Sequence, residues 1–167
     1  MTATVYGTGT LHAVAVDARP CPTDPVPDLV VHEYERGFRA DLTASREAVS
    51  GVRALTRRVR SMHGTDLAES AELVVSELMG NAVRASDSRE AVPLVVEVHA
   101  AQPGIEVIVH DTVPGQPNRG EAALDSAEAE SGRGLGILDA LTDRWSVEPS
   151  TEPSFTKMIR CLVSRAE

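Results

Sequence analysis

Two polar residues four positions apart, Glu77 and Asn81, form the first pattern in this sequence that could do chemistry. Residues at i and i+4 share one face of a helix, and the apolar neighbours Leu78 and Ala82 point into a core. A carboxylate in this place could orient a water, and a carboxamide oxygen one turn away could coordinate Mg²⁺. Gly80 costs a helix about 1 kcal/mol relative to alanine, which indicates a close approach to the backbone. A solvated glutamate and a helix-surface asparagine are the alternative interpretation.

A second pattern places three glycines within five residues, at Gly132, Gly134 and Gly136, directly before an apolar helical stripe. Backbone amides without side chains at a helix start form an anion site, which the helix dipole strengthens. The segment follows a long loop and not a strand, so it is no dinucleotide fingerprint. The chain has no P-loop motif, and Lys157 is its only lysine. Glycines that simply end a loop are the alternative.

Two further candidates lie on predicted strands. Asp111 follows a strand predicted for 105–110, where a buried carboxylate could accept a hydrogen bond from an exocyclic amine. An Asx-type turn is the alternative role for it. Thr156 lies on the last predicted strand, where an exposed threonine would be equally ordinary. The histidines show no metal-ligand spacing, and we expect His99 and His110 to face outward from their strands.

The periodicity of the apolar residues predicts the elements that must position these side chains. Steps of three and four indicate helices, alternation indicates strands, and Pro103-Gly104 predicts a hairpin turn. In chain order we expect a strand at 38–42, a helix ending near Gly64 and capped by Thr43 or Ser45, a helix from Asp66, strands at 92–98 and 105–110, a loop at 112–131, a helix at about 134–144 and a last hairpin at 146–163.

Consecutive hairpin strands exclude a doubly wound parallel sheet. The predicted fold class is an α/β (α+β) two-layer sandwich, in which about three helices cover one face of a mixed, mostly antiparallel sheet. Four of the ten prolines fall between Pro20 and Pro27. We therefore expect residues 1–35 to form a flexible extension, followed by a single domain at 36–165 with the loop 112–131 as a lid.

Composition narrows the function classes. The chain has 167 residues, of which 42% are hydrophobic and 25% charged, as in ordinary globular domains. A net charge of −9 argues against direct binding of nucleic acid. No apolar run is long enough for a membrane span and no signal peptide is visible, so we expect a cytoplasmic protein. Two cysteines are too few for a disulfide scaffold.

Taken in this order, the patterns resemble the GHKL (Bergerat-fold) ATPases. Within that superfamily, the chain is similar to the small bacterial histidine-kinase-like ATP-binding domains of the anti-sigma-factor serine kinase group. The resemblance covers about residues 35–164. The matching parts are Ser76 to Arg84 for the N box, His110-Asp111 with Gly115 for the G1 box, Ser131 to Ile137 for the G2 region, and Thr156-Lys157 for the terminal threonine motif.

The resemblance implies a role for each matching residue. Glu77 would orient or deprotonate the attacking hydroxyl or water, and Asn81 would ligate the Mg²⁺ that bridges the phosphates of ATP. Asp111, in the same box as Gly115, would bind the adenine amino group, with Thr156 supporting it through a water. The phosphate-binding amides would be those around Gly132, Arg133, Gly134, Leu135 and Gly136.

The resemblance implies an ATP- and Mg²⁺-dependent serine/threonine kinase that acts on a partner protein, a sigma factor or an anti-anti-sigma-like regulator. The alternative is a non-catalytic interaction protein that sequesters such a regulator, and a homodimer is compatible with either. Val113 stands where the G1 box usually has its first glycine. The lid carries Glu121, Asp125, Glu128 and Glu130, which predicts weak or partner-assisted closure over a polyphosphate. We expect it to order when nucleotide binds.

Overall fold

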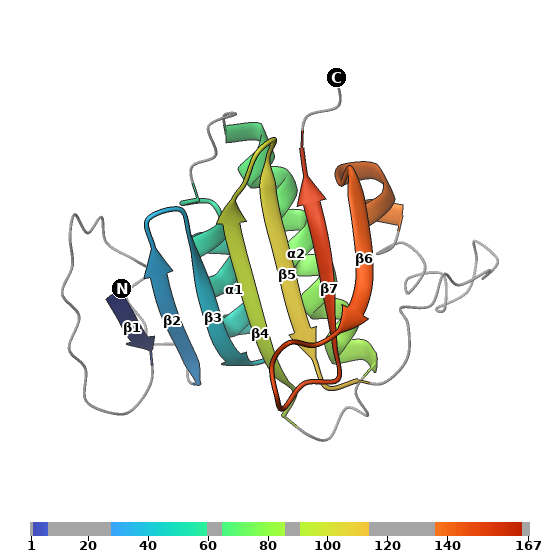
Figure 1. The fold of residues 1–167 in the computed structure, drawn as a ribbon. Coiled ribbons are helices and arrows are strands. Elements are labelled where there is room, and N and C mark those ends of the chain that lie inside the picture. Colours follow the sequence, from blue (N-terminus) through green and yellow to red (C-terminus); the bar gives the residue numbers. More distant parts are fainter. Residues whose placement is uncertain (1, 7–27, 60–64, 86–90, 114–135, 165–167) are drawn as a thin grey trace.

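The computed structural model describes residues 2–6, 28–59, 65–85, 91–113 and 136–164. Its centre is a seven-stranded sheet with the order β1-β2-β3-β4-β5-β7-β6 (Figure 1). The described strands pair antiparallel throughout, with no parallel pair among them. The strands are β1 (Thr2–Tyr6), β2 (Leu29–Tyr34), β3 (Gly37–Thr43), β4 (Pro93–Ala100), β5 (Ile105–Asp111), β6 (Arg144–Pro149) and β7 (Lys157–Val163).

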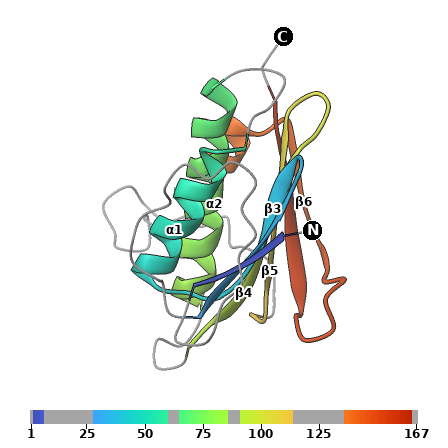
Figure 2. The ribbon, with the colours of Figure 1, turned by 90° about the vertical axis from the view of Figure 1, so that its left-hand side faces the viewer.

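The helices α1 (Arg46–Thr56) and α2 (Thr65–Ala85) and a short helix at 136–141 complete the described elements. Figure 2 shows α1 and α2 on one side of the sheet, so the predicted two-layer α+β class is confirmed. Ser45 caps α1, because its side chain accepts a hydrogen bond from the amide of Ala48. None of the helices in the described part of the chain is long and apolar enough to cross a bilayer.

The C-terminal ends of α1 and of the helix at 136–141 differ from the predicted bounds. α1 ends at Thr56, well before Gly64, because the amides of Arg58 and Val59 turn back to carbonyls only three residues earlier. Val59 is still buried, so its apolar spacing reflects a packed turn. The short helix ends at residue 141, because Arg144 already begins β6.

The sheet begins before residue 36, the predicted start of the domain. β2 pairs with β3 along its whole length, and Leu29 and Val31 are buried in the hydrophobic core. β1 in turn pairs with β2. The prolines at 20–27 dominate this part of the sequence and concealed the short alternating strand that follows them.

Side chains alternate between a face covered by the helices and an open face, which bears no described helix. Phe38, Ala40 and Leu42 of β3 lie in the core beneath the helices. Their neighbours Arg39 and Asp41 point to the open face. The same alternation along β5 puts Val109 and Asp111 on the helix side and His110 on the open face.

Candidate functional site

The C-terminal half of α2 holds Glu77, Gly80, Asn81 and Arg84 on one partly exposed surface. Nη2 of Arg84 donates a hydrogen bond to Oδ1 of Asn81 over 2.5 Å and lies 3.7 Å from a carboxylate oxygen of Glu77. A Cβ at Gly80 would lie 3.2 Å from Nη1 of Arg84, so the missing side chain leaves room for the guanidinium. The close approach predicted at Gly80 therefore comes from the helix's own arginine.

The side-chain oxygens of Asn81 and Glu77 are of the kind that Mg²⁺ prefers, but Arg84 competes with a metal ion for them. A guanidinium bonded to Oδ1 uses one lone pair of that oxygen and puts a positive charge beside any cation on the other. The residues thus fit Mg²⁺ when negative charge, such as a polyphosphate, draws the guanidinium away. Among the described residues, no group of three or more His, Cys, Asp or Glu side chains forms another metal site.

Asp111 is the last residue of β5 and is only 3% exposed. Its Oδ1 accepts a hydrogen bond from the amide of Val113 over 2.8 Å and lies 3.3 Å from Nζ of Lys157. Burial raises the pKa of Asp111 above its ordinary value, and the charge of Lys157 partly offsets this. Both interpretations of the sequence therefore describe this residue, because it forms an Asx turn and is also a buried carboxylate at a strand end.

β7 and the residue before it supply the neighbours of Asp111. Lys157 is paired with Asp111 in the β5–β7 register, and its Nζ also donates to the carbonyl of Val113 over 2.7 Å. The amide of Thr156 donates to the carbonyl of Asp111 over 2.9 Å, and its hydroxyl donates to the carbonyl of Thr112 over 3.1 Å. The structure therefore places Thr156 beside Asp111, with contacts to its backbone.

Figure 1 shows the C-terminal ends of α2 and β5 at the same end of the molecule, and the two elements pack together. The residues predicted to act on the phosphates, Glu77 and Asn81, thus lie on the element next to the strand that ends in Asp111. Gly136 begins the described part of the short helix, with no described atom within 4 Å of a Cβ added there. The other predicted phosphate and G1-box residues and most of the lid fall outside the described residues, namely Gly115, Gly132, Arg133, Gly134, Leu135 and 114–131.

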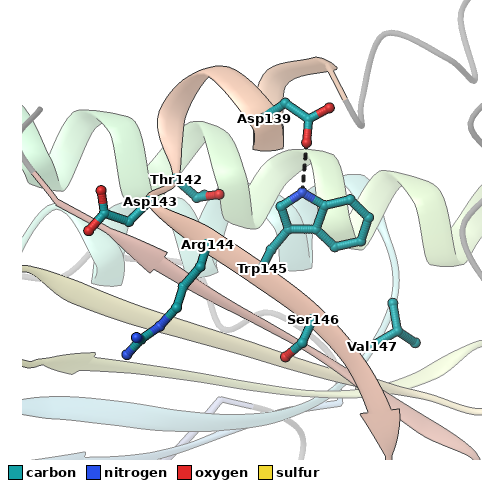
Figure 3. Close-up of a pocket in the computed structure, with 7 residues that line it drawn as sticks. All are labelled: Asp139, Thr142, Asp143, Arg144, Trp145, Ser146 and Val147. Carbon is teal, nitrogen blue, oxygen red and sulfur yellow. Dashed lines mark hydrogen bonds between the residues drawn. The ribbon is translucent and has the colours of Figure 1, made fainter.

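A cavity of about 530 Å³ lies between the short helix and the start of β6 (Figure 3). The indole Nε1 of Trp145 donates to the carboxylate of Asp139 over 2.9 Å there. Trp145 lies on β6, because the helix ends four residues earlier. The cavity contains none of the predicted site residues. Its lining consists of Asp139, Thr142, Asp143, Arg144, Trp145, Ser146 and Val147.

The structure shows contacts of three residues that the sequence did not predict. Arg84 follows Asn81 by three residues, a spacing that predicts a shared helix face. Lys157 meets Asp111 through the β5–β7 register, which no pattern in the sequence reveals. His110 was expected to face outward, and it does point to the open face, but it is only 1% exposed. It is buried because the β6–β7 loop lies over it, with Ser150 Oγ 2.9 Å from its Nδ1.

A family model described as a histidine kinase-like ATPase domain matches residues 38–159. The match spans nearly three quarters of the chain and runs from β3 into β7. It therefore includes α2 with its polar surface, the end of β5 and the loop before β7. A search of curated proteins gave no match to the chain.

Proposed function

Since this chain belongs to the histidine kinase-like ATPase domain family, a membership that implies ATP binding, we propose that it holds Mg-ATP between the ends of β5 and α2. We further propose that it transfers the γ-phosphoryl group to a serine or threonine of a regulatory protein, a sigma factor or an anti-anti-sigma-like partner. The observation that carries the nucleotide site is Asp111, a carboxylate 3% exposed at a strand end beside a polar helix surface.

The base-binding half of the site is assigned to Asp111. Among the described residues, both side-chain contacts of Asp111 go to Oδ1, from Val113 and Lys157. Oδ2 is therefore the atom that accepts a hydrogen bond from the adenine amino group. A buried carboxylate selects a donor at that position of the base, and guanine presents a carbonyl oxygen there. The site thus favours ATP over GTP.

The phosphate-binding half is assigned to α2. When polyphosphate is present, Arg84 turns from Asn81 to a phosphate oxygen, because a charged acceptor forms a stronger hydrogen bond than an amide. This frees Oδ1 of Asn81 as a Mg²⁺ ligand. Bound Mg²⁺ supplies neutralisation of the phosphate charge, which phosphoryl transfer requires. Glu77 then orients the attacking hydroxyl and accepts its proton.

One observation favours the second candidate function, partner sequestration without turnover. Arg84 contacts both Asn81 and Glu77 without nucleotide, so the residues expected to handle Mg²⁺ and the attacking hydroxyl are engaged by the protein itself. A protein in which this contact persists would bind its regulator and transfer nothing.

Transfer of label from γ-labelled ATP to a co-expressed partner separates the two functions. We expect the parent protein to label its partner, and Glu77→Gln to bind Mg-ATP normally but to transfer at least about a hundredfold more slowly. Glu69→Gln is the matched control, because Glu69 is exposed on the same helix two turns earlier. Full transfer by Glu77→Gln would remove the role of Glu77. Partner capture without any transfer by the parent would favour sequestration.

A further inference from the structure

The loop that joins β6 to β7, residues 150–156, contacts both β3 and β5 through its side chains. We call this loop the strap. Figures 1 and 2 show it on the side of the sheet away from the helices. The strap is internally ordered by hydrogen bonds from the amide of Glu152 to Ser150 Oγ, over 3.0 Å, and from the amide of Phe155 to the carbonyl of Glu152, over 3.1 Å. Its shape is therefore set within the strap, and its position depends on what it touches.

One contact ties the strap to a distant strand. Arg39 of β3 donates two hydrogen bonds to the carboxylate of Glu152, over 2.7 and 3.1 Å. In the sheet, β4 and β5 lie between β3 and β7, so this pair spans the open face. Asp41 accepts two more hydrogen bonds from the same guanidinium, over 3.0 and 2.9 Å, and Glu97 lies 3.5 Å away. Arg39 is thus held in place before it meets Glu152, a preorganised geometry suited to a bidentate pair.

Two residues near the ends of the strap contact β5. Ser150 Oγ lies 2.9 Å from Nδ1 of His110, and the Phe155 ring packs edge-on against the imidazole with centroids 6.3 Å apart. On its other side, Nε2 of His110 is 3.7 Å from Glu97. The nearby imidazole of His110 lowers the pKa of Glu97, with a further contribution from His99. These contacts form a network on the open face, which runs from Arg39 through Glu97 to His110, the residue directly before Asp111. We call it the open-face network.

The strap ends at the predicted nucleotide site. Its last residue, Thr156, contacts the backbone of Asp111 and Thr112, and the next residue, Lys157, contacts Asp111 and Val113. His110 and Asp111 are neighbours that project to opposite faces of the sheet. The strap therefore contacts the side chain of His110 on the open face and the backbone of Asp111, whose carboxylate is the one assigned to adenine.

We propose that Arg39 and Glu152 are positioning residues for nucleotide selection: their ion pair holds the strap so that Thr156 and Lys157 keep the end of β5 in the shape that binds adenine. This inference rests on the proposed nucleotide site. Neither residue touches the base. They act through Ser150 on one side of the strap and through the Thr156 amide on the other, so their loss changes base recognition without removing any group assigned to ATP.

The test compares ATP and GTP affinities of Glu152→Gln with those of the parent protein. Glutamine keeps the size of the side chain and removes the charge that Arg39 binds. We expect ATP to bind about fivefold more weakly and the ATP-to-GTP preference to fall, since the bidentate ion pair is replaced by at most one hydrogen bond from Arg39 to an uncharged amide. A purely structural role would lower the unfolding temperature and leave this preference unchanged.

Two further variants make the result specific. Glu148→Gln is the matched control, because Glu148 lies on β6 next to the strap and its side chain accepts a hydrogen bond from Ser146, outside the pair. It should keep parental affinities. Arg39→Gln should weaken ATP binding as Glu152→Gln does, and the double variant should add little, because both changes break one contact.

The outcomes separate this inference from the proposed function. A parent protein that binds no ATP would overturn both. A parent that binds and prefers ATP, with the same affinities and preference in Glu152→Gln, would overturn only the role of the strap. A lowered preference in Glu152→Gln, normal values in Glu148→Gln and non-additivity with Arg39→Gln support it.

Discussion

The two halves of the candidate site are built in opposite ways. At the end of β5, Asp111 is buried and bonded to the backbone of Val113, with Lys157 beside it. On α2, Asn81 and Glu77 lie on a partly exposed surface, and among the described residues both contact the side chain of Arg84, itself 47% exposed. One half is a rigid network and the other depends on a single long side chain.

This difference indicates that the two halves of the site recognise different parts of a nucleotide. A buried carboxylate has a high cost of desolvation, so it is useful where selectivity for one hydrogen-bond donor is needed. Exposed side chains can rearrange at little cost, so they suit a ligand that arrives with its own cation and charge. The comparison predicts that changes at β5 are large and base-specific, while changes on α2 are smaller and phosphate-specific.

The largest expected effect comes from Asp111→Asn. The amide presents mixed donor and acceptor groups in place of a charged acceptor, so ATP affinity should fall by roughly a hundredfold and the preference over GTP should vanish. Titration with ATP, GTP and adenosine measures this. Asp143→Asn, in the cavity beside β6, is the matched control and should bind as the parent does. Unchanged adenosine binding in Asp111→Asn would contradict the assignment.

Lys157→Met should give the next largest effect, on stability. It leaves the buried carboxylate of Asp111 without its nearby positive charge and removes the hydrogen bond to the Val113 carbonyl. We expect unfolding free energy at neutral pH to fall by about 2 kcal/mol. Denaturant unfolding measures the loss, and the Asp111→Asn background should reduce it because the uncompensated charge is then absent. An equal loss in both backgrounds would show that the pair is not coupled.

The pH dependence of stability should distinguish Asp111 from the open-face glutamates. The pKa of Asp111 is raised by burial, so its contribution is complete below the ordinary value of 3.8 and is lost as pH rises through the raised pKa. The pKa of Glu97 is lowered, so its contribution is complete above the ordinary value of 4.5 and is lost as pH falls. Unfolding across the acid range should show Asp111→Asn and Glu97→Gln removing opposite slopes. Slopes of the same sign would contradict the burial assigned to Asp111.

Arg84→Ala should have the smallest effect on the fold, below about 0.5 kcal/mol, because the side chain is half exposed. Mg-ATP affinity should fall about fivefold through loss of the phosphate contact, while adenosine affinity stays unchanged. Calorimetric titration with both ligands measures the contrast, and Arg84→Lys should restore part of the Mg-ATP affinity. A tighter Mg-ATP complex in Arg84→Ala would instead mean that the arginine only obstructs Asn81.

Local patterns predicted most of the fold. The alternation of Phe38, Ala40 and Leu42 and the turn at Pro103-Gly104 gave the correct strands and hairpin because each depends on neighbours in the chain. The two wrong helix ends have a common cause. Apolar spacing predicts which residues are buried, but it does not say whether a buried residue lies on a helix. Val59 and Trp145 both pack against the core, the first from a turn and the second from a strand.

The candidate site was predictable only as separate pieces. Spacing alone put Glu77 and Asn81 on one helix face. The pairing of Lys157 with Asp111 depends on β7 inserting between β5 and β6, and the burial of His110 depends on a loop reaching back to Arg39 of β3. These contacts join residues at least 40 positions apart in the chain, where a single sequence carries no periodic signal.

Lys157 is the only lysine of the chain, and its side chain is 11% exposed. An acylating reagent directed at amines therefore has one side-chain target in the whole protein, and that target lies 3.3 Å from Asp111. Most proteins carry many such groups, whose labelling reports an average over the surface. Here the rate of acylation, measured on the peptide that contains Lys157, reports how readily the start of β7 opens to solvent. The amine of Lys157 therefore makes changes at the candidate site measurable without an introduced probe.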